Sequence, residues 1–185
     1  GQLASRMEIG TGWSARAELE RALSMLEKLV SYQEKTGRTL VGVEERFSIN
    51  IGNIVISGSV DRLEITSDGL LFVVDLKTSK YPISTKDGEE HPQLKLYQLA
   101  VSEGKFNHLA PETTPAGAEL FYPSSGNNGA QRKQLPIEAK DVREMIVNDG
   151  NTVSSPVFRA VENDLCDNCA LKSSCPVRPE GRTLR

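Results

Sequence analysis

Hydrophobic and polar positions follow a helical spacing in three segments of the chain. Residues 14–34 have an apolar stripe at every third or fourth position, which is typical of one buried helix face: Leu19, Ala22, Leu23, Leu26, Leu29 and Val30. Thr36-Gly37 is expected to end this helix. The same spacing predicts helices over residues 90–103 and 139–148, with Gly150 as the cap of the last one. We expect these helices to be packing elements.

Other segments are rich in β-branched residues and bounded by turn residues, which is typical of strands. They predict five strands, at residues 39–50, 54–65, 70–78, 118–122 and 134–137. Polar connections are expected at residues 81–90 and 123–132. The pattern as a whole indicates an α/β fold, with a mixed central sheet of about five strands flanked by helices.

The second and third predicted strands form a hairpin, because Thr66-Ser67-Asp68-Gly69 between them is a tight-turn signal. Folding the hairpin symmetrically about Asp68 sets Asp61 opposite Asp75. Side chains alternate along a strand, so Asp75 and Lys77 share one face. The pattern therefore predicts two neighbouring carboxylates with an ammonium group beside them.

The negative charge of these two carboxylates needs a nearby positive charge, because the apolar run Leu71-Phe72-Val73-Val74 indicates that the strand is buried. Like charges opposite each other in a sheet are destabilising, and buried charges cost more. A divalent cation such as Mg²⁺ would offset both, and it suits phosphodiester hydrolysis. The alternative is a solvated surface pair, which is how most Asp-X-Lys sequences occur.

Composition changes this picture little. The 185 residues suffice for one domain with a substantial core, and the formal net charge of −3 argues against strong autonomous DNA binding. It does not exclude a nuclease that receives DNA from a neighbouring motor domain. No run of about eighteen apolar residues and no signal-peptide pattern is present, so we expect a cytoplasmic protein with no membrane contact.

Three short motifs together resemble a known nuclease family. They are Gly58-Ser59-Val60-Asp61-Arg62, Val73-Val74-Asp75-Leu76-Lys77-Thr78 and Gln93-Leu94-Lys95-Leu96-Tyr97. In this order they are similar to the RecB-type nuclease domain of the PD-(D/E)XK superfamily, which is fused to ATP-dependent bacterial helicases of the RecB, AddB and AdnAB kind. The resemblance covers roughly residues 41–175 and implies a restriction-endonuclease-like core.

The resemblance also implies roles for individual residues. Asp61, Asp75 and the Leu76 carbonyl would hold Mg²⁺ or Mn²⁺, and Lys77 would stabilise negative charge or position the attacking water. Glu44 matches a glutamate of the family's first strand, although a solvent-facing role fits it equally. Gln93 and Tyr97 would approach the active site or the DNA backbone; by spacing alone, Tyr97 is a half-buried core aromatic.

Three cysteines, Cys166, Cys169 and Cys175, form a C-x₂-C-x₅-C cluster. In a cytosolic protein such a cluster indicates zinc or an iron–sulfur centre, but both need four ligands. The resemblance implies a [4Fe–4S] cluster whose fourth cysteine lies upstream. The family also has an upstream active-site histidine, whereas the two histidines here, His91 and His108, follow the hairpin. His91 is expected to be a surface or capping group, with a catalytic role as the alternative.

Both departures from the family suggest a fragment of a larger helicase–nuclease, with an incomplete cluster and weak or no activity by itself. We expect an upstream remnant or tag at residues 1–13, a nuclease core at 14–160 and a Cys-rich tail at 161–185. The expected function is DNA cleavage, with exonuclease action favoured, in repair and recombination; upstream helicase domains and a second subunit are the expected partners. The competing classes are a non-catalytic DNA-binding or scaffold domain and a zinc-ribbon-like interaction module.

Overall fold

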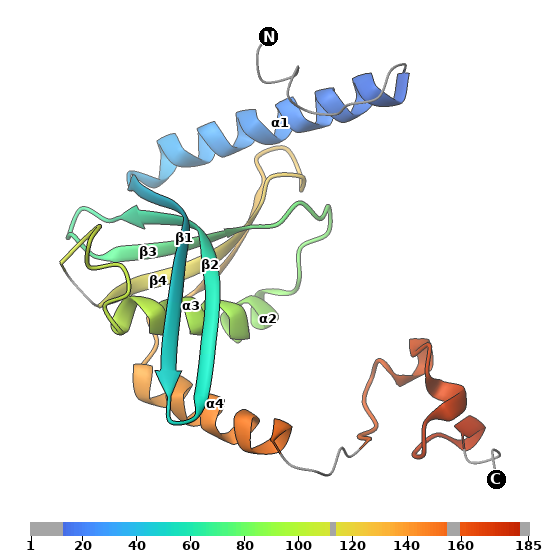
Figure 1. The fold of residues 1–185 in the computed structure, drawn as a ribbon. Coiled ribbons are helices and arrows are strands. Elements are labelled where there is room, and N and C mark those ends of the chain that lie inside the picture. Colours follow the sequence, from blue (N-terminus) through green and yellow to red (C-terminus); the bar gives the residue numbers. More distant parts are fainter. Residues whose placement is uncertain (1–12, 112–113, 155–159, 182–185) are drawn as a thin grey trace. The chain divides into compact units, whose positions relative to one another are not determined.

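The computed structural model describes residues 13–111, 114–154 and 160–181, and the expected upstream remnant lies almost wholly outside them. The chain divides into two compact units, residues 1–146 and 147–185. Figure 1 shows the elements in order: α1 Trp13–Thr36, β1 Thr39–Ile51, β2 Ile54–Ile65, β3 Leu71–Leu76, α2 Thr85–Glu89, α3 Pro92–Ser102, β4 Pro115–Tyr122, β5 Ala130–Gln134 and α4 Ala139–Val153. Three 3₁₀ turns follow, at Cys166–Asn168, Lys172–Ser174 and Pro179–Gly181. The fold is α/β, as the sequence predicts.

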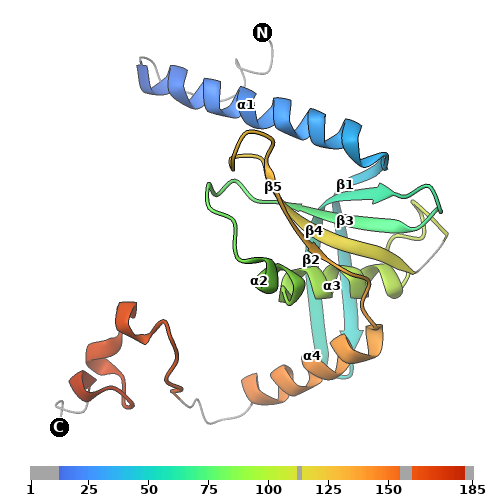
Figure 2. The ribbon, with the colours of Figure 1, turned by 180° about the vertical axis from the view of Figure 1, so that it is seen from behind.

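One mixed sheet contains all five strands in the order β1-β2-β3-β4-β5. The pairs β1–β2, β2–β3 and β4–β5 are antiparallel, whereas β3 and β4 are parallel. A parallel pair needs a long crossover, and here α2 and α3 provide it. Figure 2 shows the sheet from behind. The mixed five-strand sheet of the sequence prediction is confirmed.

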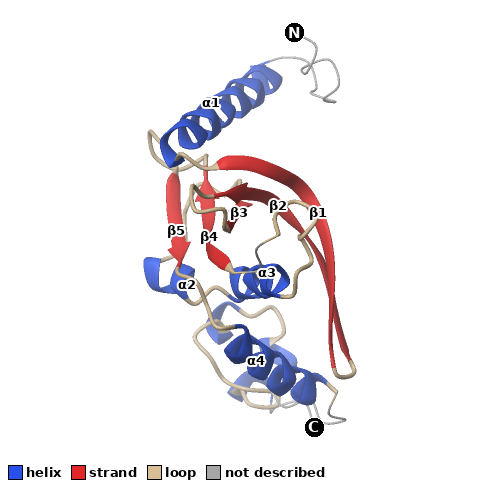
Figure 3. Cartoon of the chain, turned by 90° about the vertical axis from the view of Figure 1, so that its left-hand side faces the viewer, coloured by secondary structure: helices blue, strands red, loops and turns tan. Residues whose placement is uncertain are grey.

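The two faces of the sheet bury different clusters. The larger core lies between the sheet and α3, with contributions from α4, and includes Leu63, Val73, Leu94, Leu99, Leu120 and Ile146. The smaller cluster lies on the α1 face, and its buried members are Tyr32, Phe72, Val74 and Phe121. Figure 3 shows α3 lying along one face of the sheet. Strand β3 thus has buried side chains on both faces, which fits its continuous apolar run.

The apolar stripe of α1 is only partly buried, so its prediction as a packing face is wrong for the middle of the helix. Leu23, Leu26 and Val30 are each at least half exposed. The helix contacts the sheet cluster through Leu29 and Tyr32, near its C-terminal end. Periodicity identified an apolar face, but the sheet reaches only the last turns of that face.

Several element boundaries differ from the sequence prediction. The expected loop 81–90 contains α2, whose N-cap Ser84 accepts a hydrogen bond from the Asp87 amide at 3.1 Å. Strand β5 pairs with β4 from Ala130, four residues before its expected start. Helix α4 continues through Gly150, because that glycine does not take the left-handed conformation that ends a helix.

Candidate active site

The hairpin of β2 and β3 fixes the register of the two aspartates. The Thr66 amide donates to the Leu70 carbonyl at 2.9 Å, and Gly69 has the positive φ of 81° that the tight turn requires. From this turn the pairing runs from Ile65↔Leu71 to Arg62↔Val74. One further step places Asp61 opposite Asp75, so the predicted hairpin and its register are confirmed.

Asp61 is tied to the end of the neighbouring strand. Its Oδ2 accepts a hydrogen bond from the backbone amide of Leu76 at 2.8 Å. The carboxylate therefore reaches across from β2 to the residue that directly follows Asp75. This contact holds one acid of the pair in place by a backbone group, whose position does not depend on a rotamer.

Asp75 is a buried acid with little compensation. Its side chain is 2% exposed, and its Oδ2 lies 2.7 Å from Lys77 Nζ. Apart from this ion pair with Lys77, Oδ2 has no hydrogen-bond partner among the described residues. Burial raises the pKa of Asp75 above its usual value; Lys77 opposes the shift, and Asp61 adds to it. The site thus favours an added positive charge.

Lys77, Gln93 and Tyr97 form a polar chain from β3 to α3. Lys77 Nζ donates to Gln93 Oε1 at 3.0 Å, and Gln93 Nε2 donates to the Tyr97 hydroxyl at 2.7 Å. The ring of Tyr97 packs edge-on against Phe47, with centroids 5.9 Å apart, so this residue is also a core aromatic. Burial raises the pKa of Tyr97, the Gln93 hydrogen bond lowers it, and Asp75, Asp61 and Glu44 raise it. The predicted residues Gln93 and Tyr97 therefore lie beside the two aspartates.

Glu44 and His91 lie at the margin of this group. The β1–β2 register sets Glu44 between the pairs Val43↔Arg62 and Glu45↔Val60, next to Asp61. Glu44 is exposed, and it is the one non-glycine among the described residues with a positive φ, 53°. His91 is the N-cap residue of α3, but its side chain makes no capping hydrogen bond and its Nδ1 is buried without a described partner. Burial and Lys77 lower the pKa of His91, whereas Asp75 raises it.

The donor set of Asp61 and Asp75 fits a hard divalent cation. Magnesium is commonly held by one or two carboxylates, with water and substrate phosphate as the other ligands. Such a cation would give the buried Oδ2 of Asp75 a second partner beside Lys77. Within the described ranges, no three histidine, cysteine or acidic side chains are close enough to hold one metal ion.

The three cysteines of the tail do not form a metal-binding group either. Cys166, Cys169 and Cys175 are free thiols, and the Cys166 sulfur accepts a hydrogen bond from the Asn163 amide at 3.2 Å. The described part of the tail does not gather them into a three-ligand set. The iron–sulfur centre therefore stays a prediction from the resemblance.

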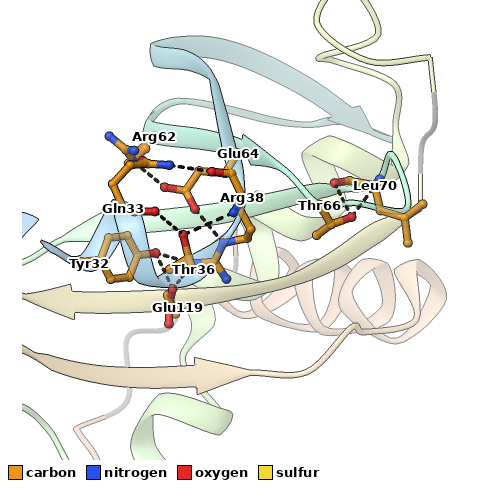
Figure 4. Close-up of polar contacts among 9 residues, drawn as sticks. All are labelled: Tyr32, Gln33, Thr36, Arg38, Arg62, Glu64, Thr66, Leu70 and Glu119. Carbon is orange, nitrogen blue, oxygen red and sulfur yellow. Dashed lines mark hydrogen bonds and ion pairs between the residues drawn. The ribbon is translucent and has the colours of Figure 1, made fainter. Parts of the chain in front are cut away.

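A buried charge network lies on the opposite face of the same strands, and sequence reasoning missed it (Figure 4). Glu64 accepts from Arg62 at 2.5 Å and from Arg38 at 2.7 Å, while Arg38 also contacts Glu119 at 2.5 Å. The Tyr32 hydroxyl donates to Glu119 at 2.5 Å. Burial, followed by Glu119, raises the pKa of Tyr32. Alternation along β2 places Arg62 and Glu64 on the face opposite Asp61, but it does not reveal that Arg38 joins them there.

Comparisons with known proteins show which family this chain belongs to. A family model described as the PD-(D/E)XK nuclease superfamily matches residues 2–176. One subunit of the ATP-dependent helicase/deoxyribonuclease of Streptococcus pyogenes serotype M1 is 33% identical over 95 residues, which are 47% of this chain and 9% of that protein. The protein of the same name from Streptococcus agalactiae serotype Ia is 35% identical over 101 residues, 50% of this chain and 9% of that protein.

This chain thus matches less than a tenth of the length of these relatives. Among solved structures, the crystal structure of SSO0001 covers 89% of this chain and 72% of its own, with 16% identity and a TM-score of 0.38. No described helix has the length and apolar character needed to cross a membrane.

Proposed function

Because the chain belongs to the PD-(D/E)XK nuclease superfamily, we propose that it hydrolyses phosphodiester bonds in DNA, with Asp61, Asp75 and Lys77 as its catalytic residues. The observation that supports this assignment best is the state of Asp75. Its carboxylate is 2% exposed, faces a second acid and has a raised pKa. A purely structural acid at this depth would be expected to have a full set of hydrogen bonds.

We assign the metal site to Asp61, Asp75 and the carbonyl oxygen of Leu76. The Leu76 amide points toward Asp61, and in a strand the amide and carbonyl of one residue face the same neighbour. Three oxygen ligands suit Mg²⁺ or Mn²⁺. When bound, such a cation polarises the scissile phosphate and makes water a better nucleophile at neutral pH.

The protein groups then act by position and charge. Lys77 Nζ, held between Asp75 and Gln93, is placed to stabilise negative charge that develops on the phosphate or to orient the attacking water. Gln93 positions Lys77, and the Tyr97 hydroxyl in turn positions Gln93. We propose that Gln93 and Tyr97 also contact the DNA backbone, and that Glu44 is a further, weaker metal ligand next to Asp61.

The names of the relatives suggest a context for this activity. We propose that the chain is the nuclease part of a helicase–nuclease that acts in DNA repair and recombination, with DNA delivered by an ATP-dependent motor. The same proposal includes exonucleolytic cleavage, a second subunit and a cytoplasmic location. It also includes a [4Fe–4S] cluster to which the three tail cysteines contribute.

Two variants on one hairpin test the catalytic assignment. Asp75→Asn keeps the size of the side chain and removes its charge, and Asp68→Asn makes the same change at the exposed turn of the hairpin. Manganese binding is measured by calorimetry, and cleavage of a labelled DNA strand is measured with Mg²⁺ or Mn²⁺ in excess. We expect Asp75→Asn to lose both and Asp68→Asn to behave as the unaltered chain.

Equal manganese binding by both variants would overturn the metal site. If the unaltered chain binds manganese at Asp75 but cleaves no DNA, the same test is repeated in a chain extended upstream, where the family resemblance places a histidine. Absence of cleavage there would overturn the nuclease proposal in favour of a non-catalytic DNA-binding domain.

A further inference from the structure

Three cations lie in a row along one face of α1. They are Arg21, Lys28 and Lys35, at intervals of seven residues. Seven residues make almost two helical turns, so the three side chains leave the helix on nearly the same side, about 10.5 Å apart along its axis. This face is distinct from the exposed apolar positions Leu23, Leu26 and Val30.

The row borders two hollows between α1 and the turn that joins β4 to β5. The first, of about 400 Å³, is lined by Arg21, Ser24, Met25, Lys28, Lys80 and Ser124. The second, of about 220 Å³, is lined by Tyr32, Lys35, Asn128, Gly129 and Gln131. Figure 2 shows this turn beside α1. The loop after β3 contributes Lys80 as a fourth cation.

The cations of this row form no ion pair among the described residues. Arg21 donates to the carbonyl of Thr78 at 3.1 Å and Lys28 to that of Gly126 at 2.8 Å, and both acceptors are uncharged. In the part of the chain that the structure describes, no carboxylate lies within ion-pair distance of these two residues or of Lys35 and Lys80. On the same helix, Glu20, Glu27 and Glu34 precede the three cations by one residue each and leave about 100° further round, so the row is the basic side of a helix with an acidic side.

Lys80 connects the row to the end of β3 that contains the candidate active site. Lys80 follows Lys77 by three residues, so their Cα atoms are at most about 11 Å apart. Beside it, Tyr81 is 80% exposed, and its ring centroid lies 5.8 Å from Lys80 Nζ. An exposed aromatic next to a track of cations is the combination that single-stranded nucleic acids bind: phosphates on the cations and a base on the ring.

We propose that Arg21, Lys28, Lys35 and Lys80 bind the phosphate backbone of a single nucleic-acid strand, and that Tyr81 stacks on one of its bases. One part of the inference rests on the proposed function: that the bound strand continues to Lys77 and the aspartate pair, where it would be cleaved. A single strand fits better than a duplex, because a ring can stack only on a base that is free of its own neighbours. Recognition is independent of sequence, since phosphates and base faces are common to all nucleotides.

Salt dependence of binding tests the row without any need for cleavage. The full chain is titrated into labelled oligothymidylate in EDTA at several salt concentrations, and the affinity is measured by fluorescence anisotropy. Each phosphate contact to a single strand contributes about 0.7 to the slope of log affinity against log salt. We expect K35Q/K80Q to lower this slope by about 1.4. The matched control K105Q/K140Q removes the same charge elsewhere and leaves the slope unchanged.

The stacking residue has its own pair of variants. Tyr81→Ala should weaken binding of the single strand by at least about fivefold, the low end for a stacked base, and Tyr81→Phe should restore it. A duplex of the same length should not distinguish these two variants. Equal weakening by alanine and phenylalanine would remove Tyr81 from the site.

Three results would overturn the row itself. They are no binding by the unaltered chain at low salt, equal slopes for the two double variants, and tighter binding of polyglutamate than of oligothymidylate, which would make the partner an acidic polypeptide. The outcome is independent of the nuclease assignment, because binding is measured in EDTA and needs no cleavage. If the chain never cleaves DNA but shows the expected salt slopes, the nuclease proposal fails and the proposal of a binding row stands.

Discussion

The backbone amide of Leu76 donates a 2.8 Å hydrogen bond to the carboxylate of Asp61, which links the first acid of the site to the strand that contains the second. An asparagine at position 61 can still accept this bond through its amide oxygen, whereas an alanine cannot. Charge and hydrogen bonding can therefore be separated at this position by two variants.

Asp61→Asn should keep the fold and weaken manganese binding at least about tenfold, because one charged ligand is lost. It should also lower the pKa of Asp75, since the charge of Asp61 raises that pKa. Calorimetry measures the first effect and an NMR titration of the Asp75 carboxyl carbon the second. Asp61→Ala leaves the Leu76 amide without its acceptor, and we expect it to be less stable than Asp61→Asn by about 1 kcal/mol.

Asp75 should make the stability of the metal-free chain depend on pH. Because its pKa is raised in the folded state, the folded chain holds this proton more tightly than the unfolded chain does. Stability is therefore lost as the pH rises from the unfolded pKa through the folded one. In EDTA, Asp75→Asn should be more stable than the unaltered chain at pH 7, by on the order of 1 kcal/mol, and the difference should vanish in acid.

Thermal unfolding at a series of pH values from acid to neutral measures the stability difference between Asp75→Asn and the unaltered chain, with Asp68→Asn as the control. A variant at position 75 that is less stable than the unaltered chain at neutral pH would show that the ion pair with Lys77 outweighs burial.

Tyr32→Phe should destabilise the chain by about 1–3 kcal/mol. The hydroxyl donates to buried Glu119 and contacts Arg38, so its removal leaves charged groups short of a partner. Tyr81→Phe is the matched control, because that tyrosine is 80% exposed. Urea unfolding compares the two, and equal midpoints would mean that Glu119 finds another donor.

Glu44→Gly should stabilise the chain by about 1 kcal/mol, because a glutamate with a φ of 53° is strained and a glycine is not. Glu45→Gly, one residue further along the same strand, has no such strain to relieve and should cost about 1 kcal/mol. If Glu44 is a metal ligand, its glycine variant should also bind manganese more weakly. Loss of stability in both variants would show that the backbone at position 44 is not strained.

The sequence predicted the aspartate pair accurately because a local signal determines it. A two-strand hairpin closed by an Asp-Gly turn has its register fixed by the turn, so the opposition of Asp61 and Asp75 needed no knowledge of the rest of the fold. The spacing of Gln93 and Tyr97 likewise placed both on one face of α3. That Lys77 is their partner was not predictable by this route, because it depends on how the crossover returns α3 to the sheet.

Other features could not be predicted from local patterns. The charges of Glu64 and Glu119 resemble those of solvated strand residues, and only the approach of Arg38 and Tyr32 from outside the sheet makes their burial possible. The apolar stripe of α1 showed which side of the helix is hydrophobic, not how much of that side a sheet would cover. The cation row on the same helix repeats every seven residues, a spacing that also occurs in apolar stripes and does not by itself indicate a binding surface. Its place beside the β4–β5 turn depends on the tertiary fold.

The parallel pairing of β3 with β4 determines the order in which the site can assemble. The β2–β3 hairpin closes over a handful of residues, so Asp61 and Asp75 can meet early. Gln93 and Tyr97 belong to the long connection that must be ordered before β4 can pair with β3, and closing long loops is slow. During folding, we therefore expect Asp61 and Asp75 to come together before Gln93 and Tyr97 reach them. A nascent chain would then have its metal ligands in place before Gln93 holds Lys77.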